Sequence, residues 1–258
     1  NWNSNAAFIA LLILPTCALF LQSSSKLQQH ALGLVILYCA MAIGVTQSRG
    51  GLLVLLVGLL PLFWVQRSQA KGYWIIAQLV IYLLLGYVVA ELLQGGGLGQ
   101  RMMQTVSSAG GTTGLSVEKL GSGRHALWAA GWQMYLDRPF LGWGLGQFHW
   151  LHASLRDPLF NNPGMFVHND LFQFLIELGP IGFALSLWFV WKLFSSGYQL
   201  YKTQKQDNRI NLYAMSLLAA CLGMFTHTLL TFHLYQSPML LLMGWYVGIL
   251  SRHTVAEN

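Results

Sequence analysis

Charged side chains are scarce in this chain: Asp, Glu, Lys and Arg make up only 9% of its 258 residues, whereas hydrophobic residues make up 55%. A soluble domain carries about 25% charged residues. So few charges cannot cover a water-exposed surface, and lipid must therefore cover much of this chain. The net charge of +6 would favour nucleic acid on a soluble protein, but here it bears on orientation in a membrane. We expect no nucleic-acid partner.

Cysteine is also rare. The three cysteines, Cys17, Cys39 and Cys221, lie inside apolar runs, and no two of them have the CxxC spacing. Buried cysteines of this kind behave as small hydrophobic residues. They predict neither a disulfide framework nor a metal site.

Long apolar runs are abundant. A transmembrane helix needs roughly 17–25 residues, and seven segments approach that length: residues 6–22, 31–47, 51–65, 73–93, 180–200, 212–233 and 235–251. We therefore predict an all-α polytopic membrane protein with about seven transmembrane helices. The first four helices lie in residues 1–94 and the last three in residues 180–258, with a long polar loop region, 95–179, between them. The chain starts without Met or a basic signal-peptide region, so we expect it to be a piece of a longer protein.

The basic residues orient these helices, because Lys and Arg are enriched in cytoplasmic loops. Four segments alternate onto one side of the membrane: 22–30, 66–72, 201–211 and 252–258. Together with Lys192 they carry the whole net charge of +6, while acids and bases balance on the other side. We therefore expect the long loop, the N-terminus and the turn at Arg49 to lie outside the cytoplasm, which is the periplasm in a Gram-negative cell.

The turn between the second and third helices, Thr46-Gln47-Ser48-Arg49-Gly50-Gly51, is the first candidate site. Arg49 stands where an apolar helix begins and has no acidic residue nearby in the sequence. It could be an interfacial anchor that reaches back to water. The positive-inside rule requires no base on this side of the membrane, however, and that favours a functional role for Arg49.

The second candidate is Arg124, which lies at the start of a helix that we expect to end near Asp137. An apolar stripe predicts that this helix is amphipathic and lies on the membrane surface or against the bundle; the stripe comprises Leu127, Trp128, Trp132 and Tyr135. A helix start favours an anion, and a guanidinium adds a bidentate fork that suits phosphate. Arg124 can therefore hold a diphosphate, and a solvated arginine is the alternative.

Residues 139–148, with the sequence PFLGWGLGQF, follow this helix. Their glycines at every second position predict a tight, close-packed turn. A nucleotide phosphate loop is excluded, because no Lys-Ser/Thr pair follows the glycines.

The third candidate is His168, directly before a short helix that begins at Asn169 or Asp170. Asn169, Gln173 and Glu177 follow at four-residue spacing and predict one polar strip on that helix. A helix N-terminus disfavours a positive charge, so we expect a neutral imidazole that can accept a proton. A general base near neutral pH needs this property. The alternative is a structural, hydrogen-bonded histidine.

These residues occur in an order that resembles a known family. His168-Asn169, nine residues and then Gly179-x-x-Gly182 resemble the signature of the bacterial O-antigen ligases. The same superfamily includes O-antigen polymerases and protein O-oligosaccharyltransferases. Three further motifs are similar to it: Ser48-Arg49-Gly50-Gly51, the Arg124…Trp128 helix and the Pro139…Gly142-x-Gly144 turn. The resemblance covers about residues 40–190, and the predicted topology puts every motif on the same side of the membrane.

The resemblance implies a metal-independent transfer of a glycan from undecaprenyl diphosphate to an acceptor, at a periplasmic site of the bacterial inner membrane and without a cofactor. It assigns the diphosphate to Arg49 and Arg124 and the activation of the acceptor to His168. Fixed guanidiniums would stabilise the negative charge that develops on the leaving group. The acceptor stays open between lipid A core, a growing glycan chain and a protein serine. Four residues are expected to support the site: Ser48, Asn169, Gln173 and Glu177.

Two other classes of protein compete with this interpretation. A membrane transporter should place ionisable groups near the middle of the bilayer, but only His227 approaches the middle of a predicted helix. A metal enzyme would need a set of ligands such as His149, His152, His168 and either Asp157 or Asp170. A His-x-x-His pair in an aromatic loop is a weak signal for such a site.

Overall fold

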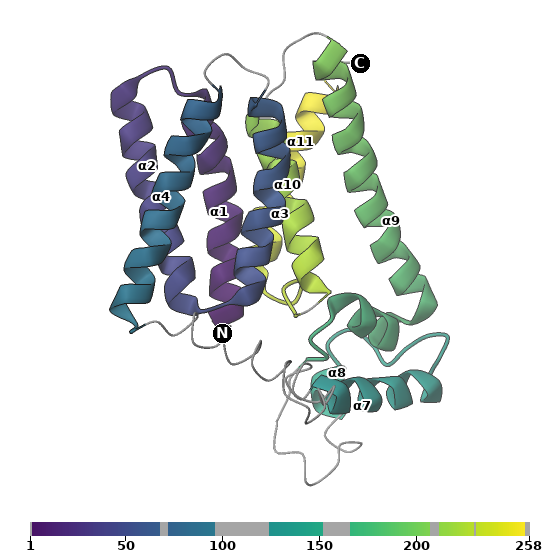
Figure 1. Ribbon diagram of the computed structural model, residues 1–258. Helices are drawn as coiled ribbons and strands as arrows, with labels where there is room; N and C mark the ends of the chain where they lie inside the picture. Colours follow the sequence, from purple (N-terminus) through teal and green to yellow (C-terminus); the bar gives the residue numbers. More distant parts are fainter. Residues whose placement is uncertain are drawn as a thin grey trace, which may run out of the picture. The chain divides into compact units, whose positions relative to one another are not determined.

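The computed structural model describes residues 2–67, 72–95, 124–151, 166–206, 212–229 and 231–255. The regular structure in these ranges is α-helical (Figure 1), which confirms the predicted all-α class. The helices are α1 (Trp2–Gln22), α2 (Lys26–Thr46), α3 (Arg49–Gln66), α4 (Gly72–Leu93), α7 (Arg124–Asp137), α8 (Phe148–Leu151), α9 (Asp170–Gln206), α10 (Leu212–Thr228) and α11 (Ser237–Val255).

The chain forms two compact units. The first unit comprises residues 1–101, 193–227 and 237–258, and the second comprises residues 102–192 and 228–236. Helix α9 contributes its N-terminal part to the second unit and its C-terminal part to the first. Arg49 therefore belongs to the first unit, whereas Arg124 and His168 belong to the second.

Five helices are long and apolar enough to cross a membrane: α1, α2, α3, α4 and residues Asp170–Gln199 of α9. Two further apolar helices, Leu212–Thr228 and Ser237–Ser251, are shorter. Helices thus occur at all seven predicted positions. The prediction that the sixth segment runs to residue 233 is wrong, because α10 ends at Thr228. Beyond this point the backbone N–H groups of His233 and Leu234 bond to a carboxylate instead of continuing a helix.

Helix α1 lies at the centre of the first unit, where it packs against α2 and α3, while α2 packs against α4 (Figure 1). Small residues let such helices approach closely. Gly58 of α3 lies against the side chain of Leu14, and Gly86 of α4 lies against the carbonyl of Leu37. A hydrogen bond of 2.9 Å from the Tyr246 hydroxyl to the carbonyl of Leu11 fixes α11 on α1.

The second unit has its own hydrophobic core, formed by Met134, Phe148, Val167 and Ile176. Leu127 and Ala130 are buried on the same face of α7 as Met134, at helical spacing. Trp128 and Trp132 of the predicted apolar stripe are 41% and 50% exposed, and the contact of this stripe with the membrane surface stays a prediction. The indole N–H of Trp128 donates to the carbonyl of Val167 at 2.9 Å, which keeps this ring at the edge of the core.

Helix α9 is interrupted at Gly179, whose φ of 66° and ψ of −169° are not helical. Pro180 follows, and it has no N–H to donate. The residues from Asp170 to Leu178 thus form the short helix that the sequence predicts. A Cβ at Gly179 would collide with the carbonyl of Phe140, so this position needs glycine for its close packing as well as for its φ.

The turn at residues 139–148 packs against the end of this short helix. Gly142, Gly144 and Gly146 have φ values of 67°, 100° and 78°. A Cβ at Gly142 would meet the backbone of Glu177, and the N–H of Gly144 donates to the carbonyl of Glu177 at 2.8 Å. The structure confirms the predicted close-packed turn.

Candidate functional site

The turn that carries Arg49 is built on a helix cap. Ser48 has an extended backbone, and its Oγ accepts the N–H of Gly51 at 3.1 Å, which caps α3. The same hydroxyl donates to Oδ1 of Asn3 in α1 at 2.8 Å. Ser48 is buried, whereas Arg49 is exposed as the first residue of α3. The cap therefore fixes the backbone from which the Arg49 side chain extends.

Close packing holds the rest of this turn. Gln47 precedes the cap with a left-handed φ of 51°, and its side chain donates to Oε1 of Gln94, just beyond α4, at 2.5 Å. Gln94 in turn donates to the carbonyl of Val45 at 2.7 Å. Gly50 lies against the buried ring of His227, where a Cβ would collide with Nε2. The turn therefore lies at the end of the first unit where α4 and α10 end.

His168 directly precedes the cap of α9. Oδ1 of Asn169 accepts the N–H of Phe172 at 3.0 Å and caps the helix. His168 has a left-handed φ of 61°, a conformation that costs roughly 1–2 kcal/mol for a residue with a Cβ. Its ring packs edge-on against Phe232, with the ring centroids 4.9 Å apart. Backbone strain of this kind persists only where the surroundings hold it, and it is concentrated at functional sites.

Asp170, the first residue of α9, anchors the loop that carries Phe232. Its Oδ2 accepts the backbone N–H groups of His233 and Leu234 at 2.8 and 3.0 Å. The Asp170 side chain is fully buried, so these hydrogen bonds pair polar atoms that have little access to water. This carboxylate thus holds the ring of Phe232 beside His168.

Glu177 is the centre of a second buried network. Its Oε2 accepts the N–H of Gly146 at 2.7 Å and the hydroxyl of Tyr235 at 2.6 Å. Its Oε1 accepts the N–H of Phe148 and Nε2 of Gln173, both at 3.1 Å. A turn that presents successive backbone N–H groups forms a nest for an anion. The turn at residues 139–148 therefore binds the protein's own carboxylate, which accounts for its structural role.

Gln173 links this network to the residue before His168. Its amide oxygen accepts the N–H of Val167 at 3.1 Å, while its nitrogen donates to Glu177. Burial and the hydrogen bond to Glu177 raise the pKa of Tyr235 well above its ordinary value, so the Tyr235 hydroxyl remains a donor. Two carboxylates thus hold the chain around His168.

A model of the family described as O-antigen ligase matches residues 32–187, more than half of the chain. The chain belongs to the O-antigen ligase family. Comparison with curated proteins and with solved structures gives no match. Family membership implies a glycosyltransferase-like membrane enzyme with a role in glycan transfer during polysaccharide biosynthesis.

The match to the O-antigen ligase family confirms the resemblance found in the sequence, and it spans Arg49, Arg124 and His168. Arg124 is the first residue of α7, but its side chain lies outside the part of the structure that is described. The predicted polar strip is partly correct. Gln173 and Glu177 are hydrogen-bonded to each other, whereas the side chain of Asn169 caps the helix instead.

The sequence did not predict the structural roles of two residues near His168, Asp170 and Tyr235. Asp170 was predicted as a possible start of the short helix and as a possible metal ligand, but its hydrogen bonds to the N–H groups of His233 and Leu234 were not predicted. Tyr235 gave no signal, because its partner Glu177 is 58 residues away. The available signal was the glycine-rich turn at residues 139–148, because a turn of this kind presents backbone N–H groups that bind an anion.

The residues on which the two competing interpretations depend are described only in part. His149 is in α8, where its ring packs on Trp150 with centroids 4.7 Å apart, and His152 and Asp157 fall outside the described residues. Among the side chains that are described, no group of three His, Cys, Asp or Glu could hold a metal ion. His227 was expected near the middle of a helix, but it lies in the last turn of α10.

Proposed function

We propose that this O-antigen ligase family member transfers a glycan from undecaprenyl diphosphate to an acceptor hydroxyl or amine at the periplasmic face of the bacterial inner membrane. The conformation of His168 carries this proposal. A non-glycine residue with a φ of 61° before a capped helix is held there at a cost in stability. The buried carboxylates of Asp170 and Glu177 fix the surrounding backbone. An imidazole held in this way is suited to be a general base.

In the proposed reaction, His168 takes the proton of the acceptor as the acceptor atom attacks the anomeric carbon. The bond from that carbon to the diphosphate breaks, and undecaprenyl diphosphate leaves with the electron pair. Attack opposite the leaving group inverts the sugar centre. The guanidiniums of Arg49 and Arg124 bind the diphosphate and stabilise its developing charge, without a metal ion. Four residues support the site: Ser48, Asn169, Gln173 and Glu177.

We further propose that α10 and α11 also cross the membrane, which gives seven spans. In this topology residues 1–94 form four spans, the region 95–179 faces the periplasm, and residues 180–258 form three spans. The excess of Lys and Arg on the opposite side supports this orientation. Labelling in intact cells of a cysteine introduced at Ser108, and protection of one introduced at Gln206, are the expected results.

The reaction is tested with the purified chain in lipid, given an undecaprenyl-diphosphate-linked glycan and an acceptor. His168→Ala should lower the rate about 10²–10⁴-fold and keep donor binding, because both arginines remain. Arg49→Lys or Arg124→Lys should weaken donor binding, since an ammonium lacks the bidentate fork. The wild-type rate should fall as pH is lowered, because a protonated ring accepts no proton. Full activity of His168→Ala would leave His168 with a structural role only.

Two further arms separate the alternatives. Loss of activity on chelation, with recovery on addition of zinc or magnesium, would assign a metal enzyme instead. The acceptor that becomes glycosylated identifies the subclass: lipid A core indicates a ligase, a growing glycan a polymerase, and a protein serine an O-oligosaccharyltransferase.

A further inference from the structure

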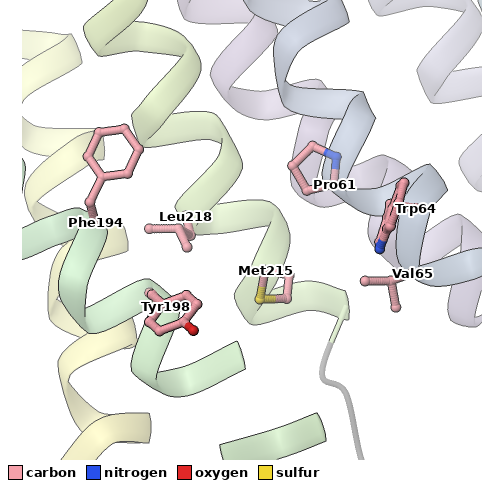
Figure 2. Close-up of a pocket in the computed structure, with 8 residues that line it drawn as sticks. Pro61, Trp64, Val65, Phe194, Tyr198, Met215 and Leu218 are labelled. Carbon is pink, nitrogen blue, oxygen red and sulfur yellow. The ribbon is translucent and has the colours of Figure 1, made fainter. Parts of the chain in front are cut away.

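An apolar groove of about 350 Å³ lies within the first unit, between α3, α10 and the part of α9 after residue 192 (Figure 2). Its floor is formed by Val65, Met215 and Leu218, which are nearly inaccessible to solvent. Gly197 of α9 lies directly against Leu218 and adds no side chain of its own. The volume is at the lower end of the range of about 300–1,000 Å³ that is typical of ligand sites.

The groove lies where three apolar helices have their ends. Trp64 is close to the end of α3 at Gln66, Tyr198 is next to the end of the apolar part of α9, and Met215 is in the first turn of α10. A helix rises about 1.5 Å per residue. Trp64 is therefore more than about 20 Å along α3 from Arg49, and the groove is separate from the proposed diphosphate site.

Aromatic side chains form the rim of the groove. Trp64 is 61% exposed and Tyr198 is 68% exposed, and Figure 2 shows them on opposite sides, on α3 and α9. Exposed tryptophan and tyrosine at the ends of apolar helices lie at the level of the lipid headgroups. In a bilayer the groove therefore opens toward acyl chains, directly below the headgroups.

Two basic side chains lie just beyond this rim. The guanidinium of Arg67, the residue after α3, lies over the ring of Trp64, 3.6 Å from its centroid. Lys202 is exposed and follows Tyr198 by four residues, on the same face of α9. The groove is apolar and has positive charge beside it at the level of the headgroups. It therefore matches a phospholipid, whose acyl chain is apolar and whose phosphate is negative.

We propose that this groove binds an acyl chain of an anionic phospholipid in the leaflet where α3 ends, and that Arg67 and Lys202 hold the lipid phosphate. A phospholipid with a net negative charge matches two cations, whereas a zwitterionic one has no net charge to offset them. Each basic residue near the membrane surface raises the affinity for an anionic lipid roughly fivefold. This site is independent of the proposed transfer reaction.

Native mass spectrometry of the delipidated full chain tests the headgroup preference. We expect phosphatidylglycerol to bind about five- to thirty-fold more tightly than phosphatidylethanolamine with the same acyl chains. The double variant Arg67→Gln/Lys202→Gln should reduce this preference to less than about twofold. The matched double variant Lys26→Gln/Lys192→Gln removes the same charge from exposed positions outside the groove and should keep the preference. Equal binding of the two lipids, or equal effects of the two double variants, would overturn the proposal.

Quenching of tryptophan fluorescence by brominated acyl chains tests the groove itself. The chain has 10 tryptophans, so the contribution of Trp64 is the difference between the wild type and Trp64→Phe. We expect brominated phosphatidylglycerol to quench this contribution more than brominated phosphatidylethanolamine at the same mole fraction. No such difference would overturn the site. Displacement of phosphatidylglycerol by an equal concentration of a polyprenyl phosphate would overturn the proposed occupant.

Discussion

The starts of α3 and α9 share one backbone arrangement but hold it in different ways. Each helix is capped by a polar side chain, Ser48 or Asn169, and each cap follows a residue with a left-handed backbone. Gln47 and His168, with φ values of 51° and 61°, are the two non-glycine residues with positive φ in the described part of the chain. At α3 the candidate residue Arg49 follows the cap, whereas at α9 the candidate residue His168 precedes it.

The hydrogen-bond partners at the two helices differ in kind. At α3 the partners are the amide side chains of Asn3 and Gln94, and Gly50 packs on His227. At α9, Asp170 at the helix start accepts the backbone N–H groups of His233 and Leu234. Glu177, near the end of the short helix, accepts those of Gly146 and Phe148. At α3 the cap fixes the backbone of the residue that is proposed to bind the diphosphate. At α9 the buried hydrogen bonds stabilise the backbone on both sides of the strained residue His168.

Removal of Glu177 tests the buried hydrogen-bond network at α9 and has the largest expected effect. Glu177→Ala leaves the N–H groups of Gly146 and Phe148 and the hydroxyl of Tyr235 without their acceptor, and each buried donor costs about 1–3 kcal/mol. We expect the free energy of unfolding, measured by reversible denaturation in detergent, to fall by about 3 kcal/mol or more. The control variant Asp137→Ala removes an exposed carboxylate at the end of α7. It should change the free energy of unfolding by less than about 0.5 kcal/mol. Equal losses would show that the Glu177 network is not what holds the second unit.

A methyl group at Gly50 tests the α3 side. Gly50→Ala drives a Cβ into the ring of His227, and overpacking of this kind costs about 1–3 kcal/mol. Gly244→Ala in α11 is the matched control, because no atom lies within 4 Å of its new Cβ. That variant should be neutral or gain up to about 1 kcal/mol, since alanine favours a helix. In thermal unfolding, the double variant Gly50→Ala/His227→Ala should recover part of the stability that Gly50→Ala loses. If the double variant recovers none, the contact with His227 is not the cause of the loss.

The two caps should contribute similar amounts despite their different partners. Ser48→Ala and Asn169→Ala each remove an acceptor for a backbone N–H and should cost about 1 kcal/mol. Ser25 caps α2 through a longer bond of 3.5 Å at an exposed position, so Ser25→Ala should cost less. Midpoints of chemical denaturation give these differences. A larger loss at Ser25 than at Ser48 would contradict the assigned caps.

Glycine at the two left-handed positions should give the smallest changes in stability and the sharpest separation of roles. His168→Gly relieves a strained φ and should leave stability unchanged or raise it by up to about 1 kcal/mol, while transfer falls as far as in His168→Ala. Gln47→Gly gains the same relief but loses its bond to Gln94, so its net effect should be near zero. Unfolding free energies and transfer rates of the same preparations are compared. A His168→Gly protein that is less stable but fully active would make His168 structural.

Helix positions followed from the sequence because apolar runs in a membrane need no particular partner to be helical. The seven predicted segments all contain helices, and the start of α9 lies at one of the two predicted residues. The end of α10 could not be predicted in the same way. The chain leaves this helix at Thr228 to reach Asp170, and His233 is 63 residues from that carboxylate in the sequence.

The sequence by itself determined the family, the start of the short helix at Asn169 or Asp170 and the close-packed glycine turn, because these features depend on residues within a few positions of one another. Only the tertiary structure decided what fills the turn and what holds His168. Glu177 and Gly146 are 31 residues apart, and Tyr235 is farther still. The left-handed backbone of His168 is the clearest case. Local preference opposes this conformation in a residue with a Cβ, and only the contacts made by distant parts of the chain can stabilise it.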